Sequence, residues 1–130
     1  MPRVSAAFFS TGIVCALAGM LLSMHMDASR DFSLAPVQFQ LNAIGWVSMA
    51  LYGTFYAMTR GTLSLGLAWT NYAVSLAGAI VLFPALAAHL STENSKWYLF
   101  VLAGDVLTIA AMLVFALSVF QELFRRRPPL

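Results

Sequence analysis

Polar side chains within apolar segments are the residues of this chain whose types and spacing could support chemistry. Gln38, Gln40 and Asn42 crowd the start of the apolar stretch 34–56, and Asp105 is the only acid deep in an apolar segment. Such groups cost free energy in a bilayer unless a neighbouring helix or a ligand satisfies them. The Asp105 carboxyl is therefore a candidate proton relay or ion site, with a purely structural hydrogen bond as the alternative.

The amides point to an interhelical cluster. Gln38 and Asn42 share a helix face at i,i+4 spacing, whereas Gln40 points elsewhere. Asn71 lies in the next apolar segment, and amides hydrogen-bond across helices in membranes, for about 0.6 kcal/mol on average. We expect the four amides to cluster, with Asp105 hydrogen-bonded to them as the structural alternative. The other alternative is an unusual cofactor site.

A second candidate site combines sulfur and imidazole. Met24, His25 and Met26 end the first apolar segment, and His89 ends the third. Thioether and imidazole together form a soft ligand set that suits copper(I). The alternative is that the methionines fill gaps in the packing and the histidines lie at the membrane interface.

The composition places all of these residues in a membrane protein. Of the 130 residues, 61% are hydrophobic and only 9% are charged, whereas about a quarter are charged in an average soluble domain. Four apolar segments of spanning length nearly fill the chain. The composition predicts an all-α, four-transmembrane-helix bundle in a single domain, 1–130, in contact with the lipid bilayer.

We expect helices at about 4–25, 36–58, 63–90 and 96–124. The first run spans roughly 33 Å at 1.5 Å per residue, enough for a bilayer core, and is too long for the usual apolar core of a signal peptide. Its small residues Gly12, Ala16, Gly19 and Ser23 predict close helix packing. Pro36 opens the second helix, and Pro84 is expected to kink the third.

Basic residues predict the orientation. Arg3, Arg60 and Arg125–Arg127 fall on one side of the expected bundle, and Arg30 and Lys96 fall on the other. The excess of basic residues marks the cytoplasmic side, so both termini are expected in the cytoplasm. The arginine triplet is interpreted as a topology anchor, not a nucleic-acid patch. The single cysteine, Cys15, excludes an intrachain disulfide.

Residues 19–56, GMLLSMHMDASRDFSLAPVQFQLNAIGWVSMALYGTFY, resemble small bacterial membrane proteins related to heme-copper oxidase (cytochrome c oxidase) subunit I. In those relatives the second helix reads approximately His-Ala-His-Leu-Asn-Leu-x-Gly-Trp-Val. The residues that match this pattern and its continuation are Ala35–Val37, Leu41, Asn42, Gly45–Val47, Tyr52, Gly53, Tyr56, Ala68, Trp69, Gly78, Leu82–Pro84 and Leu102–Gly104.

The same resemblance marks where ligands are missing. Gln38 and Gln40 stand where the relatives have a pair of histidines, and Asn71 stands where a further histidine follows the tryptophan of the third helix. These are the degenerate haem positions. Histidine is an axial ligand of haem iron, and a neutral amide is a poor replacement. The resemblance therefore implies the fold of the family without its haem ligands.

From these observations we expect a multi-pass protein of the bacterial inner membrane, leaning away from an enzyme, with no predicted cofactor. The preferred hypothesis is a non-catalytic accessory subunit of a larger redox or energy-transducing complex, held by other membrane subunits or by self-association. One alternative is a haem b-binding electron-transfer protein. Another is a copper-handling membrane protein.

Overall fold

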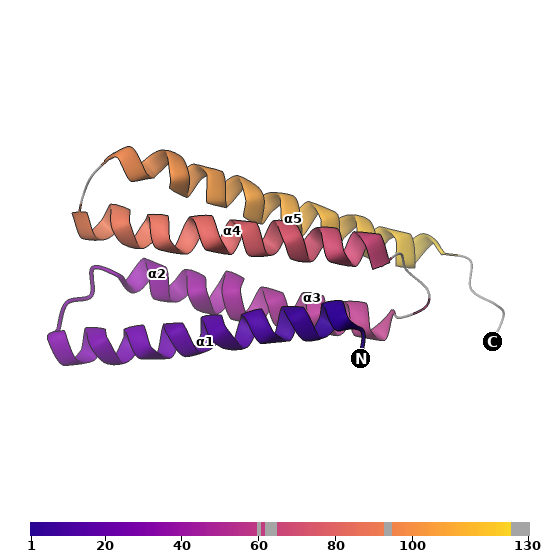
Figure 1. Cartoon of the computed structure of the whole chain (residues 1–130), viewed down its shortest axis with the longest axis horizontal. Coiled ribbons are helices and arrows are strands. Elements are labelled where there is room, and N and C mark those ends of the chain that lie inside the picture. The colour runs from indigo at the N-terminus through magenta and orange to yellow at the C-terminus, as the bar shows by residue number, and fades with distance from the viewer. Residues whose placement is uncertain (60, 62–64, 93–94, 126–130) are drawn as a thin grey trace.

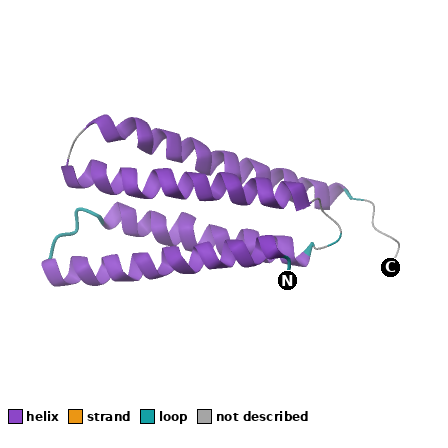
Figure 2. Ribbon diagram, in the orientation of Figure 1, coloured by secondary structure: helices purple, strands orange, loops and turns teal. Residues whose placement is uncertain are grey.

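Four helical runs make up the fold in a computed structural model of the chain, which describes residues 1–59, 61, 65–92 and 95–125. The first is α1 (Arg3–Ser29). The second is continuous and comprises α2 (Ala35–Gln40), a π-helical segment η1 (Leu41–Ser48) and α3 (Met49–Met58). The third is α4 (Leu65–Thr92), and a short 3-10 turn η2 (Ser95–Trp97) leads into the fourth, α5 (Tyr98–Phe124). The described residues contain no strand, so the predicted all-α class is confirmed (Figure 2).

The runs form two antiparallel hairpins that lie side by side. One hairpin pairs α1 with α2, η1 and α3, and the other pairs α4 with α5 (Figure 1). The N-terminus, the end of α3, the start of α4 and the end of α5 share one end of the bundle, which we call the terminal end. The opposite end, called the loop end, holds the α1–α2 turn and the start of η2.

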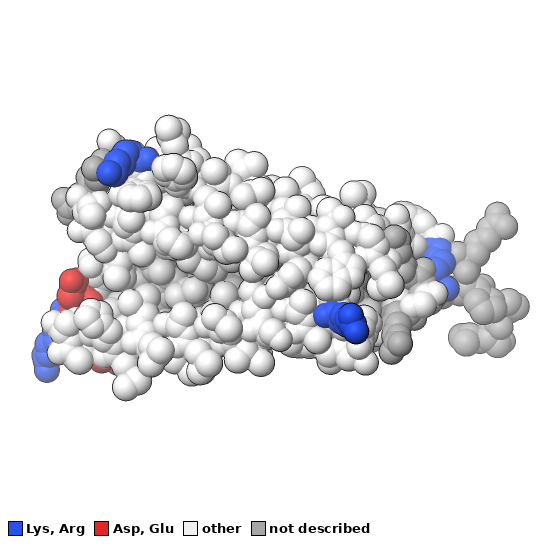
Figure 3. Space-filling view, viewed as in Figure 1, with Lys and Arg blue, Asp and Glu red and all other residues white. Residues whose placement is uncertain are grey.

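Within the part of the chain that the structure describes, three helices are long and apolar enough to cross a membrane: Arg3–Ser29, Leu65–Thr92 and the run Ser95–Phe124. The second run also covers 24 residues, from Ala35 to Met58, but the π segment divides it. Charge follows the same geometry, because Lys, Arg, Asp and Glu on the visible face gather toward the two ends and leave the middle uncharged (Figure 3). These features indicate a multi-pass membrane protein.

Small residues set the distances within each hairpin. A Cβ atom at Gly45 would lie 2.6 Å from the Cβ of Cys15, and one at Gly104 would lie 2.6 Å from the Cβ of Leu82. Only glycine permits these backbones to come so close. Gly12 likewise contacts Trp46, and Gly19 contacts Asn42, so the predicted packing role is confirmed for these two glycines of α1.

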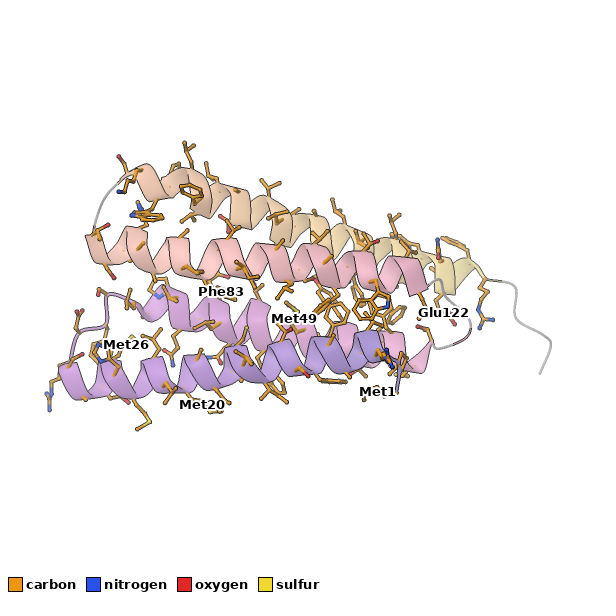
Figure 4. All side chains as sticks on the ribbon, in the orientation of Figure 1. Met1, Met20, Met26, Met49, Phe83 and Glu122 are labelled. Carbon is orange, nitrogen blue, oxygen red and sulfur yellow. The ribbon has the colours of Figure 1, made fainter. Side chains whose placement is uncertain are left out.

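The core lies between the hairpins in two clusters. Near the terminal end, buried residues of α1, α3 and α4 pack around aromatic rings: Val4, Phe8, Met49, Tyr52, Tyr56 and Ala68. Toward the loop end the second cluster is mainly aliphatic and includes Leu41 and Leu82, with one aromatic ring from Phe83. Met49 and Phe83 are seen between the two hairpins in Figure 4.

The helix boundaries differ from the expected ones mainly at the end of α1. We expected the first helix to end at about residue 25, but it continues to Ser29 and ends where Arg30 adopts a left-handed conformation with φ 56°. The Ser29 hydroxyl donates to the His25 carbonyl and accepts the Asp31 N–H, which satisfies backbone groups at this helix end. The α4 helix runs through Pro84 without a break.

Candidate functional site

A chain of buried hydrogen bonds joins the hairpins near the terminal end. Asn71 on α4 is fully buried, and its Nδ2 donates to the Tyr56 hydroxyl at 3.1 Å. The Ser75 hydroxyl donates to Asn71 Oδ1 at 2.9 Å. On the other side, Tyr56 lies 2.8 Å from the Ser118 hydroxyl of α5. We call Ser75, Asn71, Tyr56 and Ser118 the polar chain.

The direction of the polar chain follows from its far end. Ser118 donates its only hydrogen to the Val114 carbonyl at 3.1 Å, so Tyr56 must be the donor to Ser118. The tyrosine oxygen is then free to accept from Asn71. Each link is therefore satisfied in a single consistent orientation, as buried polar groups require.

Aromatic rings surround the polar chain. Phe8 of α1 stacks on Tyr56 with a centroid distance of 5.8 Å and meets Tyr72 edge-on at 5.2 Å. Phe115 of α5 contacts Tyr52 at 4.7 Å. The Thr11 and Tyr72 hydroxyls, 3.0 Å apart, add a hydrogen bond between α1 and α4. The arrangement is a buried junction of all four helical runs, and its described side chains contain no nucleophile–base pair.

The expected amide cluster does not form. Asn71 hydrogen-bonds to Tyr56, which follows Gln40 by sixteen residues in the same helical run, or roughly 24 Å along the axis. The physical reason is antiparallel pairing, which sets the start of α4 beside the end of α3. Gln38 and Gln40 are half-buried near the loop end, and Asn42 is exposed beside Gly19.

The distance between the glutamines and Asn71 decides whether these positions could ligate one haem. Two axial ligands of one iron must approach it from opposite faces of one porphyrin, so their side chains have to lie at the same depth. Gln38 and Gln40 lie near the loop end, and Asn71 lies near the terminal end. Both polar atoms of the Asn71 side chain are also hydrogen-bonded, Nδ2 to Tyr56 and Oδ1 to Ser75. These positions do not fit one shared haem.

Asp105 lies on the surface of α5 and not in the polar chain. Its side chain is half-buried, seven residues into α5, or roughly 10 Å from the helix start. No described residue forms a hydrogen bond or ion pair with its carboxylate. The structural alternative that we considered, a hydrogen bond to the amides, is therefore wrong for the described residues.

The copper candidates lie on two helices near the loop end, with Met24, His25 and Met26 on α1 and His89 on α4. Successive helical residues turn by about 100°, and Met24 is 68% exposed whereas Met26 is 3% exposed. The two thioethers therefore lie on different faces of α1. His25 is exposed, while His89 packs against Tyr98 with a centroid distance of 6.2 Å. The described residues contain no group of three His, Cys, Asp or Glu placed to hold a metal.

One charged turn has a defined electrostatic environment at the loop end. The backbone N–H of Ser33 donates to Asp31 Oδ1 at 3.0 Å. This bond, followed by the Ser33 side chain, lowers the pKa of Asp31 below its ordinary value. The charge of nearby His25 lowers the pKa of Asp31 by a smaller amount. These interactions favour the ionised form of the Asp31 carboxyl.

Sequence reasoning missed three members of the polar chain, Tyr56, Ser75 and Ser118. A usable signal existed for one of them, because Ser75 follows Asn71 by four residues and so shares its helix face. Tyr56 was noticed only as part of the resemblance to subunit I. Ser118 carried no signal, since a serine in an apolar helix usually bonds its own backbone.

Comparisons with known proteins identify no family. No family model matches the chain, and no match was found among curated proteins or solved structures. The resemblance to heme-copper oxidase subunit I therefore rests on the residues quoted above. What the observations support directly is a small, all-α protein of four helical runs, three of which are long and apolar enough to span a membrane.

Proposed function

We propose that this chain is a non-catalytic integral membrane subunit that packs against other subunits in a larger redox or energy-transducing complex of a bacterial inner membrane. Asp105 is the observation that carries the proposal. A carboxyl at the centre of a membrane helix costs roughly 2.5–3.5 kcal/mol on insertion scales, which is an upper value for Asp105 because it lies roughly 10 Å from the start of α5. The described residues supply no partner for its carboxylate. A neighbouring subunit with a basic or amide side chain would offset that cost.

The outer face of α5 is consistent with such packing. Only Gly104, Ala111 and Ser118 of this helix are buried. Eight of its exposed large apolar residues recur every three or four positions and form one stripe: Leu99, Leu102, Val106, Ile109, Leu113, Leu117, Phe120 and Phe124. Asp105 adjoins this stripe, so one partner helix along α5 could cover the apolar residues and reach the carboxylate.

The redox part of the proposal rests on the resemblance of residues 19–56 to heme-copper oxidase subunit I. The structure supports the non-catalytic part, because the positions where the relatives carry histidine hold amides at opposite ends of the bundle. In this proposal the shared fold is retained as a packing unit. Haem and oxygen chemistry belong to other subunits.

The test is the size of the particle that contains this chain. Tagged chain is extracted from native membranes in mild detergent and resolved by native electrophoresis, with mass spectrometry of the band. We expect Asp105→Ala to release the chain from a larger species, because an unpaired charge is then left on the partner. Asp105→Glu should retain the larger species.

The matched control is Asp31→Ala, which removes a carboxyl from the exposed turn and should leave the particle unchanged. Mixing tagged and untagged copies distinguishes self-association from a hetero-complex. A 14.1 kDa chain that migrates as a monomer in every variant would contradict the proposal.

Orientation has its own test. We propose cytoplasmic termini, from the basic residues at the terminal end; of these, Arg60, Arg126 and Arg127 lie outside the described residues. In a Cys15→Ser background, a membrane-impermeant thiol reagent should label Ser29→Cys from outside and Gly61→Cys from inside. The opposite pattern would reverse the orientation.

A further inference from the structure

A cavity lies in the seam between the hairpins, beside the polar chain. It has a volume of about 160 Å³ and is bounded by η1 and α3 on one side and by α4 and α5 on the other. Four of its lining residues carry hydroxyls: Ser48, Tyr52, Ser75 and Thr108. Ile109 also lines it and is 60% exposed, so the cavity reaches the lateral surface of the bundle, where the bilayer would be.

The hydroxyl hydrogens are already committed at three of these residues. Ser48 donates to the Ala43 carbonyl, Ser75 to Asn71 Oδ1, and Thr108 to the Gly104 carbonyl. A hydroxyl whose hydrogen is used still has lone pairs that can accept. These three side chains therefore favour an occupant that donates hydrogen bonds.

Tyr52 is different. Its hydroxyl lies 3.8 Å from the Met112 sulfur, and a thioether is a weak acceptor. This hydrogen can be redirected to an occupant at small cost. The cavity wall thus offers several acceptors and one readily available donor.

Size narrows the class of occupant. An engineered cavity of about 150 Å³ lined by apolar residues binds one benzene, so 160 Å³ accommodates one six-membered ring. The remaining wall is apolar, including Ile44 and Met49, which suits a ring face. Ser48 and Ile44 belong to the π segment, and π-helical turns are frequent at functional sites.

We propose that this cavity binds a single aromatic ring carrying a hydroxyl group, a phenol or hydroquinone headgroup that enters laterally from the bilayer. The ring hydroxyl donates to the Thr108 or Ser48 oxygen and accepts from Tyr52. The proposal goes beyond the subunit function and does not depend on it, since the site lies within one chain.

The test compares two ring compounds that differ by one hydroxyl. Full-length chain in phosphatidylcholine nanodiscs is titrated with 4-fluorophenol and with fluorobenzene, followed by ¹⁹F NMR, and binding to empty nanodiscs is subtracted. We expect fluorophenol to bind about two- to tenfold more tightly, the range that one net hydrogen bond provides. The triple variant Ser48→Ala, Tyr52→Phe and Thr108→Val should remove that preference.

Thr54→Val is the matched control. Thr54 is exposed on α3 and donates to the carbonyl four residues earlier, as Thr108 does on α5, so its loss should leave both affinities unchanged. Ala111→Leu should fill the cavity and abolish binding of both compounds, with circular dichroism to confirm folding. Absence of saturable binding above empty nanodiscs, equal affinities for the two compounds, or a preference that survives the triple variant would each overturn the proposal.

Discussion

Removing one hydroxyl from the centre of the polar chain should destabilise the bundle measurably. In Tyr56→Phe the ring remains in its aromatic cluster, but Asn71 Nδ2 loses its acceptor at 3.1 Å and Ser118 loses the contact at 2.8 Å. Leaving a buried donor unsatisfied costs about 1–3 kcal/mol. Interhelical hydrogen bonds in membranes average about 0.6 kcal/mol, and two of them give a similar lower bound of about 1 kcal/mol.

The two neighbours of Tyr56 should lose different amounts of stabilisation when its hydroxyl is removed. Ser118 keeps its bond to the Val114 carbonyl, so most of the loss should come from Asn71. A double-mutant cycle of Tyr56→Phe with Asn71→Leu should therefore show a coupling of about 1 kcal/mol, whereas the cycle with Ser118→Ala should show less.

The measurement is reversible unfolding in mixed micelles of mild detergent and dodecyl sulfate, followed by tryptophan fluorescence. Tyr98→Phe is the control, because Tyr98 is 52% exposed and should change stability by under about 0.5 kcal/mol. If Tyr56→Phe destabilises no more than Tyr98→Phe, the polar chain does not stabilise the junction and our reasoning is refuted.

Three further predictions follow from packing, ligand geometry and charge. Gly104→Ala should lower the free energy of unfolding by about 1–3 kcal/mol in the same assay, because the new Cβ would lie 2.7 Å from the Leu82 Cα. Gly78→Ala should lower it less, because its new Cβ would come no closer than 3.3 Å to the neighbouring helix. Equal losses in the two variants would contradict the close approach at Gly104. Purified chain should show no Soret band at one haem per chain, and Gln38→His with Asn71→His should not create a bis-histidine haem; a bis-histidine spectrum in that variant would mean that the two positions meet. The Asp31 carboxyl should titrate below 3.8 by ¹³C NMR, with Ser33→Pro raising its pKa. Because the pKa of Asp31 is lower in the folded chain, its contribution to stability is complete above the pKa of the unfolded chain and is lost as the pH falls through the pKa of the folded chain. A titration midpoint at or above 3.8 would show that the Ser33 hydrogen bonds do not stabilise the Asp31 carboxylate.

The helical runs could be predicted because length and apolar content nearly determine them in a membrane protein. The second run was expected at 36–58 and comprises Ala35–Met58 in the structure. The end of α1 was placed too early, since Asp27 and Ser29 read as loop residues, yet Ser29 continues the helix through its bond to the His25 carbonyl.

The contacts between helices were harder to predict. These helices are apolar on most faces, so no amphipathic stripe tells which side meets a neighbour. The sequence suggested that Asn71 would join the glutamines because amides attract amides. Its actual partner, Tyr56, is set by the antiparallel course of α4, which only the fold reveals. The π geometry of Leu41–Ser48 has no counterpart in the sequence that we can identify.

The contacts between the hairpins differ at the two ends of the bundle, and lipid can replace the contacts at one end more easily than those at the other. Between the described residues, the side-chain hydrogen bonds that join one hairpin to the other come from Thr11, Tyr52, Tyr56 and their partners, all in the half toward the terminal end. Near the loop end the hairpins meet through aliphatic side chains such as Leu41 and Leu82. Acyl chains are as apolar as leucine and can replace such contacts at little cost, but they cannot replace a hydrogen bond. A lipid tail or a partner helix that wedges between the hairpins will therefore enter from the loop end, and the polar junction will act as the pivot about which the hairpins part.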